Sequence, residues 1–239
     1  MKKIQKVLTL LLIVTVVIGS YQARAVNRPT GWVKEYGSWH FYDEETHNLV
    51  KNQIVGDSNG EYYYVDQEGA RVDEEVMNLA VSYILENTKE EWTSEKKLEV
   101  CVDSLIENHK FKNLGDPDEV DASYMRSYAK RFFTKKNGNC FCHAAAVCYI
   151  AKALGYSDVR VGKGILSGHY TEDKKKTSKH GWAEIRKSSD EKWKIYDLTF
   201  SRRYPKKKLL NVSRKKYAYQ LKTKTNFILT SDNGFIKWE

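Results

Sequence analysis

Three short segments of this 239-residue chain hold side chains that together could attack a carbonyl group. Cys140 supplies a thiol, His180 an imidazole and Asp197 a carboxylate. In a nucleophilic triad the imidazole takes the proton of the thiol, and the carboxylate orients the imidazole. These residue types therefore predict covalent catalysis through Cys140.

Cys140 is predicted to lie at the start of a buried helix over residues 140–154. Asn139 can cap this helix and Gly155 can end it. Its apolar face consists of Ala144, Val147, Cys148, Ala151 and Leu154. The unpaired N–H groups and the dipole of a helix start favour an anion, so they stabilise a thiolate and can hold a developing oxyanion. A buried structural cysteine, the common fate of a free thiol, is the alternative.

His180 and Asp197 are predicted to lie on neighbouring strands. His180 opens the apolar strand 182–185 after a loop rich in Lys, Thr and Ser, and Asp197 ends the strand 193–196. Antiparallel pairing of these strands would place the two side chains next to each other. Taken alone, they are a surface histidine and a turn-forming aspartate. His169 is an alternative base, but it lacks the Trp-x-Glu pattern that follows His180.

The elements that must position these residues change in character along the chain. Apolar residues recur at helical spacing at Val76, Leu79, Ala80, Tyr83 and Ile84, and again at Leu98, Cys101, Val102 and Leu105. A third helix is predicted over about 121–133. The later apolar runs are short and strand-like, at 159–161, 182–185, 193–196, 227–229 and 235–238. Helices first and antiparallel strands later predict an α+β fold.

Residues 75–200 resemble the papain-like transglutaminase core. Gly138-Asn139-Cys140 with Ala144 is similar to the family's Gly-x-Cys-x-x-x-Ala helix, which ends at a glycine, here Gly155. Arg160-Val161 is similar to the Arg-Val pair of the next strand. His180-Gly-Trp-Ala-Glu184 is similar to its His-x-Trp-x-Glu strand.

The end of the resemblance lies at Trp193–Thr199, which is similar to the family's Trp…Asp-Pro-Thr strand with Leu198 in place of the proline. The resemblance implies that Cys140 is the nucleophile, His180 the general base and acid, and Asp197 the residue that orients it. It also implies N-terminal helices and a nucleophile helix packed on an antiparallel sheet.

Two features depart from the family pattern. Phe141-Cys142-His143 follows the nucleophile, where small polar or acidic residues are common in the family. The family's upstream residue that assists the oxyanion is not readable, and Tyr124 and Tyr128 are candidates. We expect no metal or cofactor, because Cys140-Phe-Cys-His143 lacks one residue of the C-x-x-C-H haem motif and its side chains diverge around a helix.

Residues 31–72 hold a repeat, because Gly37–Asp43 aligns with Gly60–Asp66 at a spacing of 23. The repeat resembles the aromatic-rich wall-binding hairpins of bacterial surface proteins, whose choline-binding members cage a quaternary ammonium. The candidate wall-binding aromatics are Trp32, Trp39, Phe41, Tyr62, Tyr63 and Tyr64. Two units cannot bury a continuous core, so we expect the module to pack on the next domain. A spacer or packing role is the alternative.

The N-terminus has the pattern of a secretory leader. Its three lysines at positions 2, 3 and 6 precede an apolar run over 7–19, and Ala23-Arg24-Ala25 is a cleavage signal. An uncleaved anchor is the alternative. The predicted organisation is therefore a signal peptide over 1–25, aromatic hairpins over 26–72 and a catalytic domain over 73–239 of a secreted protein.

Charge and cysteine content limit the partners. Removal of the leader lowers the formal net charge from +9 to +5, but residues 202–224 contain ten Lys or Arg and no acidic residue. Such a stretch favours anionic wall polymers or lipid headgroups over nucleic acid in an exported protein, or is a solvated basic face. Cys142 and Cys148 are expected to be buried free thiols, and a Cys101–Cys148 disulfide is possible.

Taken together, these features predict a secreted thiol enzyme that acts on a peptide or protein substrate through a thioester. We expect a peptidase or amide hydrolase rather than a protein cross-linker. The alternative is a catalytically inactive protein that binds the cell wall or a partner.

Overall fold

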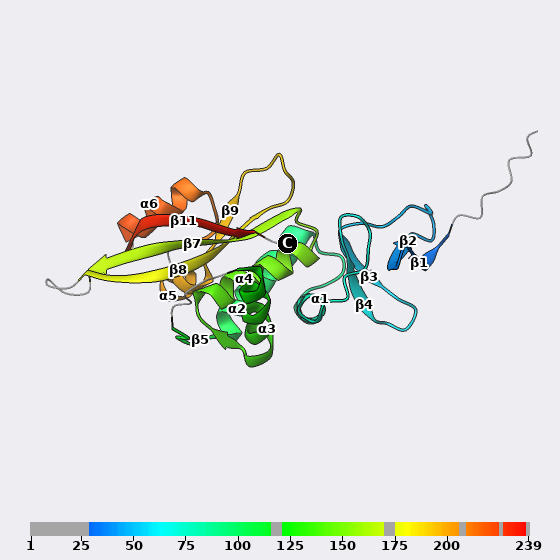
Figure 1. The fold of residues 1–239 in the computed structure, drawn as a ribbon, viewed down its shortest axis with the longest axis horizontal. Helices are drawn as coiled ribbons and strands as arrows, with labels where there is room; N and C mark the ends of the chain where they lie inside the picture. The colour runs from blue at the N-terminus through cyan, green and yellow to red at the C-terminus, as the bar shows by residue number, and fades with distance from the viewer. Residues whose placement is uncertain (1–28, 116–120, 170–174, 206–208, 225–226, 238–239) are drawn as a thin grey trace, which may run out of the picture.

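The structure is a computed structural model that describes residues 29–115, 121–169, 175–205, 209–224 and 227–237. The predicted leader over 1–25 lies outside these residues. Helices pack on one face of a five-stranded sheet, a further helix covers the other face, and two small hairpins extend from one end (Figure 1). This arrangement of helices and antiparallel strands confirms the predicted α+β fold.

Four helices form the first layer. They are α1 (Glu75–Asn87), α2 (Ser94–Asn108), α3 (Ala122–Lys135) and α4 (Cys140–Ala153). Side-chain oxygens of Thr93, Asp121 and Asn139 cap α2, α3 and α4 by accepting a backbone N–H of the first turn. Almost every residue of α4 is buried. Because α1, α2 and α3 surround it and the sheet lies beneath it, α4 is the central helix of this layer.

The sheet is antiparallel throughout, in the order β10-β9-β8-β7-β11. Its strands are β7 (Asp158–His169), β8 (Lys175–Arg186), β9 (Lys194–Tyr196), β10 (Leu210–Val212) and β11 (Phe227–Lys237). A two-residue parallel pair of β5 (Lys110–Phe111) and β6 (Asn137–Gly138) runs beside the start of α4. Because α4 packs on β8, and β8 pairs with β9, the sheet holds the segments around His180 and Asp197 against the nucleophile helix.

The prediction of a loop before His180 is wrong in part. Residues 175–179 extend β8 and pair with residues 165–169 of β7. A ladder is formed by backbone groups, so a run of Lys, Thr and Ser does not prevent pairing when a long partner strand is present. His180 therefore lies in the middle of β8 rather than at its start. The remaining part of that loop, residues 171–174, lies outside the described residues.

The two faces of the sheet bury separate clusters. The larger cluster joins α1–α4 to Ala183 and Ile185 of β8. The smaller cluster lies on the other face and consists of Leu166, Trp182, Ile195, Phe200, Leu209, Val212, Tyr217 and Leu221. It is covered by α6 (Arg214–Lys224), and Phe200 of α5 (Leu198–Arg203) reaches it from the helical layer. Part of the basic stretch 202–224 is thus folded into the core of the protein.

The aromatic repeats form two hairpins, β1–β2 (Gly31–Glu35, Ser38–Tyr42) and β3–β4 (Gln53–Gly56, Tyr62–Val65). The second hairpin packs on α1 and on the end of α4. Tyr64 is buried there, and Asn52 donates its side-chain N–H to the carbonyl of Gly155 at 2.7 Å. The second hairpin is therefore bound tightly to the helical layer.

The described residues contain neither a membrane-spanning helix nor a cluster of metal ligands. None of their helices has the length and apolar character needed to cross a membrane. Within the same ranges, no group of three or more His, Cys, Asp or Glu side chains is arranged to hold a metal ion.

Candidate active site

Cys140 is the first residue of α4, as its sequence context predicts. The Asn139 side-chain oxygen accepts the N–H of Cys142 at 3.2 Å, and the Asn139 carbonyl accepts the N–H of His143 at 3.1 Å. The N–H groups of Cys140 and Phe141 belong to the same helix end, where the helix itself supplies no acceptor. Cys140 is 8% exposed, so the thiol lies just below the surface at the positive end of the helix.

His180 and Asp197 come together as the strand pairing predicts. In the register of β8 and β9, Ala183 is opposite Tyr196. The Nε2 atom of His180 lies 2.8 Å from Oδ2 of Asp197, and both side chains are buried. The predicted antiparallel arrangement is therefore what brings the imidazole and the carboxylate into contact.

Asp197 accepts three hydrogen bonds. Besides His180, Oδ2 accepts the hydroxyl of Tyr217 at 2.8 Å, and Oδ1 accepts the N–H of Phe200 at 3.0 Å. The last bond caps α5, so Asp197 performs the turn-forming role that its sequence position suggests and orients His180 as well. A buried carboxylate with three donors is held in one orientation.

The protonation of His180 depends on both of its neighbours. Burial by itself would lower the pKa of His180, but the Asp197 carboxylate and the Cys140 sulfur outweigh it and raise the pKa to about 10. Because Nε2 is bonded to Asp197, Nδ1 is the nitrogen that remains for the hydrogen bond with the Cys140 sulfur. The imidazole thus lies between the thiol and the carboxylate.

Glycine 181 allows α4 to approach the sheet closely. A Cβ atom at Gly181 would lie 2.5 Å from the ring of Phe141, and one at Gly138 would lie 2.3 Å from Cβ of Cys142. His143 is buried as well, and its Nδ1 lies 2.8 Å from Oγ1 of Thr199. The three residues after the nucleophile therefore fill the space between α4 and its neighbours.

Glu184 forms a buried ionic network next to the triad. Its Oε2 pairs with Arg160 at 2.6 Å, and its Oε1 pairs with Arg214 at 2.6 Å and accepts the indole N–H of Trp182 at 2.9 Å. A buried carboxylate needs such partners to remain ionised. Glu184, the glutamate of the His-x-Trp-x-Glu strand, thus links β8 to β7 and to α6.

Of the two candidate oxyanion residues, Tyr128 lies closer to the nucleophile. Its hydroxyl is hydrogen-bonded with Asn139, and burial together with the charges of Cys142, Tyr124 and Cys140 raises the pKa of Tyr128. Tyr124 stacks obliquely on Tyr128 with ring centres 5.5 Å apart and is 40% exposed. The phenol of Tyr128 is therefore the side-chain donor near the helix start.

All four cysteines are free and buried, so the possible Cys101–Cys148 disulfide is not formed. Burial raises the pKa of Cys101 and of Cys142 to about 12, and it raises the pKa of Cys148 further. These thiols remain protonated at neutral pH. Cys140 differs from them because it lies at a helix start beside an imidazole.

The predicted wall-binding aromatics gather around an internal cation. The guanidinium of Arg71 lies over the rings of Tyr63, Trp32 and Trp39 at 4.3, 5.7 and 5.8 Å. Phe41 packs edge-on against Trp32 with ring centres 5.3 Å apart. Tyr64 is buried with its hydroxyl bonded to Asn52, and Tyr62 is 46% exposed.

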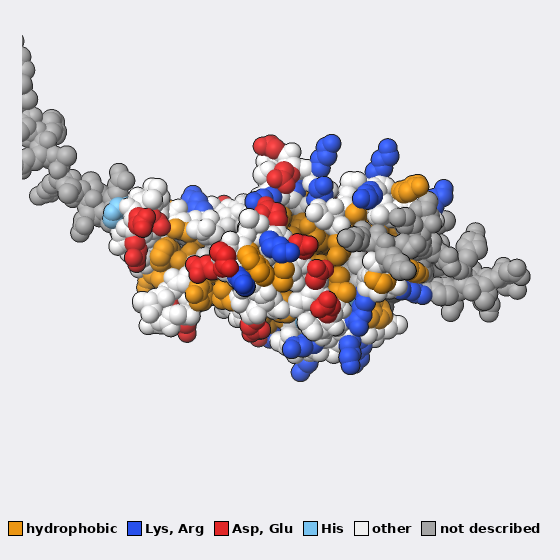
Figure 2. All heavy atoms as spheres, turned by 180° about the vertical axis from the view of Figure 1, so that it is seen from behind, with side chains coloured by type: hydrophobic (Ala, Val, Ile, Leu, Met, Phe, Trp, Pro, Cys, Tyr) orange, Lys and Arg blue, Asp and Glu red, His pale blue; other side chains and the backbone are white. Residues whose placement is uncertain are grey.

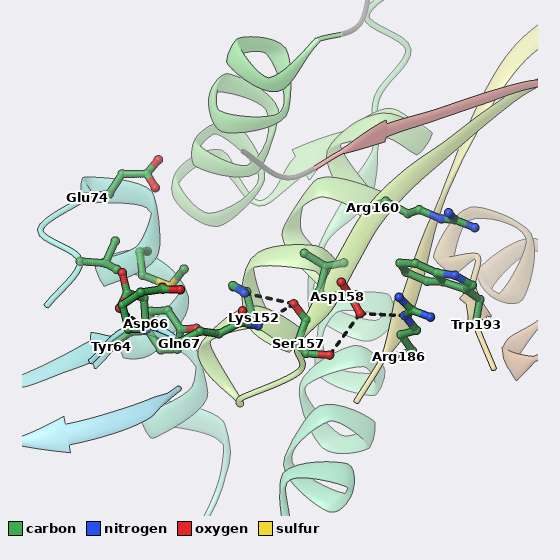
Figure 3. A pocket seen from close by; sticks show the side chains of 14 residues that line it. Tyr64, Asp66, Gln67, Glu74, Lys152, Ser157, Asp158, Arg160, Arg186 and Trp193 are labelled. Carbon is green, nitrogen blue, oxygen red and sulfur yellow. Dashed lines mark hydrogen bonds and ion pairs between the residues drawn. The ribbon is translucent and has the colours of Figure 1, made fainter. Parts of the chain in front are cut away.

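A hollow of about 620 Å³ lies away from the triad, between the second hairpin and the sheet (Figure 3). Figure 3 shows Asp66, Gln67 and Glu74 on one side of it and Arg160, Trp193 and Arg186 on the other. Both of its arginines are already paired, since Arg186 binds Asp158 at 2.7 Å and Arg160 binds Glu184. The Ser157 hydroxyl in its lining donates to Asp158 at 3.2 Å, but neither a histidine nor a cysteine lines the hollow, and the candidate chemistry remains at Cys140.

Sequence reasoning missed Tyr217 and Arg214, which reach the site from α6. Both lie in the basic stretch that suggested a polyanion surface. The available signal was the apolar pair Tyr217 and Leu221, spaced by four among lysines, which marks the inner face of a helix. His169, the alternative base, ends β7, and only its backbone is described.

Part of the chain is similar to a known protein family. Residues 82–198 match the model of the Transglutaminase-like superfamily. Over this stretch the chain is similar to a transglutaminase-like domain. The matched stretch includes all three triad residues and ends before α6.

A solved structure from Cytophaga hutchinsonii, described as a "Putative Cysteine Protease", is 16% identical to the chain with a TM-score of 0.32. The alignment covers 52% of this chain and 37% of that one, so the chain spans little more than a third of its length. No curated protein matches the chain.

Proposed function

We propose that this protein is a thiol hydrolase that cleaves a peptide or amide bond through a thioester on Cys140. The single observation that carries the proposal is the position of the His180 imidazole, between the Cys140 sulfur and the Asp197 carboxylate. An imidazole held in this way takes a proton from a thiol and returns it to a leaving group. The transglutaminase-like domain supports a thiol enzyme at the level of the family.

The reaction follows from the two ring nitrogens of His180. Because the pKa of His180 is raised to about 10, Nδ1 already holds the Cys140 proton near neutral pH, and the thiolate attacks the carbonyl carbon, so that a C–S bond forms and the carbonyl π electrons move to oxygen. Collapse of this intermediate breaks the C–N bond, and Nδ1–H protonates the departing amine. Water then attacks the thioester with His180 as base, which releases a carboxylic acid and restores the thiol.

The start of α4 provides donors for the oxyanion. The N–H of Cys140 points out of the helix end, and the phenol of Tyr128 lies near it beside Asn139. Fixed donors in a site of low water content stabilise developing charge strongly, and the loss of one typically slows a reaction by about 10²–10³-fold.

An amine in place of water would give transamidation from the same thioester. We propose hydrolysis as the main outcome, since water is always present in large excess over an acceptor amine. The experiment therefore measures both products.

We further propose that the protein acts outside the cell, where its basic end contacts an anionic wall polymer. Residues 31–72 carry eight acidic and three basic side chains, whereas residues 73–239 carry 23 acidic and 32 basic ones. Figure 2 shows acidic side chains gathered at the hairpin end and Lys and Arg toward the other end. Charge supports a polyanion contact at α6, where Lys215, Lys216 and Lys222 are exposed, more than at the hairpins.

The test is peptide cleavage by the purified protein. Peptides from a cell extract and from purified cell walls are incubated with the protein, with and without glycine ethyl ester, and products are identified by mass spectrometry. We expect new carboxyl ends with wild-type protein and none with Cys140→Ser. An acyl group on Cys140 after acid quenching would identify the thioester.

The contrary result is also informative. If the folded wild-type protein yields neither cleaved peptides nor an acyl adduct from either mixture, the hydrolase proposal is wrong. Amine adducts in excess of free acids would replace hydrolysis by transfer.

A further inference from the structure

Tyr217 lies outside the matched transglutaminase-like stretch and yet contacts the triad. It belongs to α6, and its side chain is fully buried. Its hydroxyl donates to Oδ2 of Asp197 at 2.8 Å, the same oxygen that binds Nε2 of His180. The carboxylate therefore receives a third donor from a helix that the family model does not include.

The position of Tyr217 is fixed on several sides. Its ring packs on Trp182 with centres 5.5 Å apart, within the cluster that also holds Leu221. The first turn of α6 is anchored by Arg214, which binds the buried Glu184 at 2.6 Å. A side chain restrained by ring packing and an adjacent ion pair holds its hydroxyl in one place.

We propose that Tyr217 is a positioning residue that acts on His180 through Asp197, so that α6 is part of the active site. The expected effect of Tyr217 on turnover rests on the proposed function. Its expected effect on the titration of His180 does not, because Tyr217 contacts Asp197 in the resting protein.

The direction of the effect follows from the shared oxygen. A donated hydroxyl withdraws part of the negative charge that Oδ2 presents to the imidazole and fixes the plane of the carboxylate. The pKa of Tyr217 is raised well above its usual value by burial and by Asp197, so the phenol remains a donor at every working pH. Loss of the hydroxyl would leave Asp197 more negative toward His180 and free to rotate. The imidazolium would be a weaker and less well aligned acid.

The test compares Tyr217→Phe with Tyr219→Phe. Tyr219 is on the same helix and 64% exposed, so it is a matched control for the loss of one phenol. NMR titration of the His180 ring should show a higher pKa in Tyr217→Phe and the wild-type value in Tyr219→Phe. In peptide cleavage, Tyr217→Phe should lower kcat by up to about tenfold and leave KM unchanged.

The inference is overturned if folded Tyr217→Phe gives the wild-type His180 titration. A purely structural role for Tyr217 would lower Tm without moving that titration. If wild-type protein cleaves no peptide while the His180 titration still moves, the proposed function fails and the positioning role stands.

A second measurement applies if Tyr217→Phe does not fold. The hydroxyl proton of Tyr217 in the wild-type protein should be protected and shifted downfield by its bond to the carboxylate. It should move upfield in Asp197→Asn. An unchanged resonance in Asp197→Asn would show that the hydroxyl does not bind Asp197 in solution and would overturn the inference.

Discussion

The active site and the hairpin module each hold a cationic side chain, but by opposite means. His180 is buried against a carboxylate and a thiol, and its charge depends on them. Arg71 lies over three aromatic rings near the surface and pairs with Asp73 at 2.8 Å. A guanidinium is charged at every accessible pH, so it performs no proton transfer. Chemistry therefore depends on burial beside a titratable partner, whereas aromatic faces alone give a structural contact.

The largest expected effect is a difference in stability between variants of Asp197 in the active site and of Asp73 beside Arg71. Asp197→Ala leaves His180 and Tyr217 without their buried acceptor, and we expect a loss of about 3–5 kcal/mol in the free energy of unfolding. Asp73→Ala, at an exposed pair, should cost less than about 1 kcal/mol. Urea denaturation of both variants checks this. Equal losses would mean that the Asp197 pair is no better than a surface contact.

The pH dependence of stability should come from the helical layer under the active site. Burial lowers the pKa of His143 to about 3, and burial and Lys136 lower the pKa of His109 to about 4. The unfolded chain binds more protons below pH 6.5, so stability should fall on acidification by up to about 1.4 kcal/mol per pH unit for each histidine. His180 acts in the opposite sense, since its raised pKa makes its contribution complete below 6.5 and lost as pH rises through about 10.

The measurement is the urea midpoint of wild-type protein and of His109→Phe between pH 4 and 8. His109 packs on Phe132 with ring centres 4.6 Å apart, so a phenyl ring suits the site. The substitution should flatten the acid limb, and an unchanged limb would show that His109 is already protonated in the folded state.

A smaller loss of stability is expected when Gly181→Ala adds a methyl group between α4 and the sheet. Gly181→Ala forces the Phe141 ring away and should cost about 1–3 kcal/mol while it displaces the start of α4. In the module, Gly37 has φ of +86° with no atom within 4 Å of the added Cβ, so Gly37→Ala meets backbone strain alone, about 1 kcal/mol. Only Gly181→Ala should slow alkylation of Cys140. Equal alkylation rates in the two variants would argue against close packing at Gly181.

The smallest effect is expected at the aromatic cluster. Arg71→Ala removes a cation from three ring faces and should lower stability by about 1 kcal/mol or less. Tryptophan fluorescence should change because Trp32 and Trp39 lose this neighbour, whereas Cys140 reactivity should not. A change in Cys140 reactivity would show that the first hairpin is coupled to the active site.

Much of the layout was predictable from local patterns. The start and end of α4 follow from Asn139 and Gly155, and the contact of His180 with Asp197 follows from antiparallel pairing of two apolar runs. Each of these features depends on residues that are close in sequence or on one simple pairing rule.

What could not be predicted depends on contacts between distant segments. Residues 175–179 are polar and join β8 only because β7 is long enough to pair with them. Tyr217 and Arg214 lie in a basic stretch whose inner face becomes visible only when α6 packs on the sheet. Arg71 looks like one more surface charge until the two hairpins place their rings around it.

The central claim is that His180 and Asp197 make Cys140 uniquely reactive among four buried thiols. The most direct measurement is the rate of iodoacetamide labelling of each cysteine near pH 7, read by peptide mass spectrometry, in wild-type protein and in His180→Ala. The account predicts selective labelling of Cys140 in wild-type protein, a rate reduced at least tenfold in His180→Ala, and no labelling of Cys101, Cys142 or Cys148 without denaturant. A Cys140 that is no more reactive than in the unfolded chain, or equally reactive without His180, would contradict it.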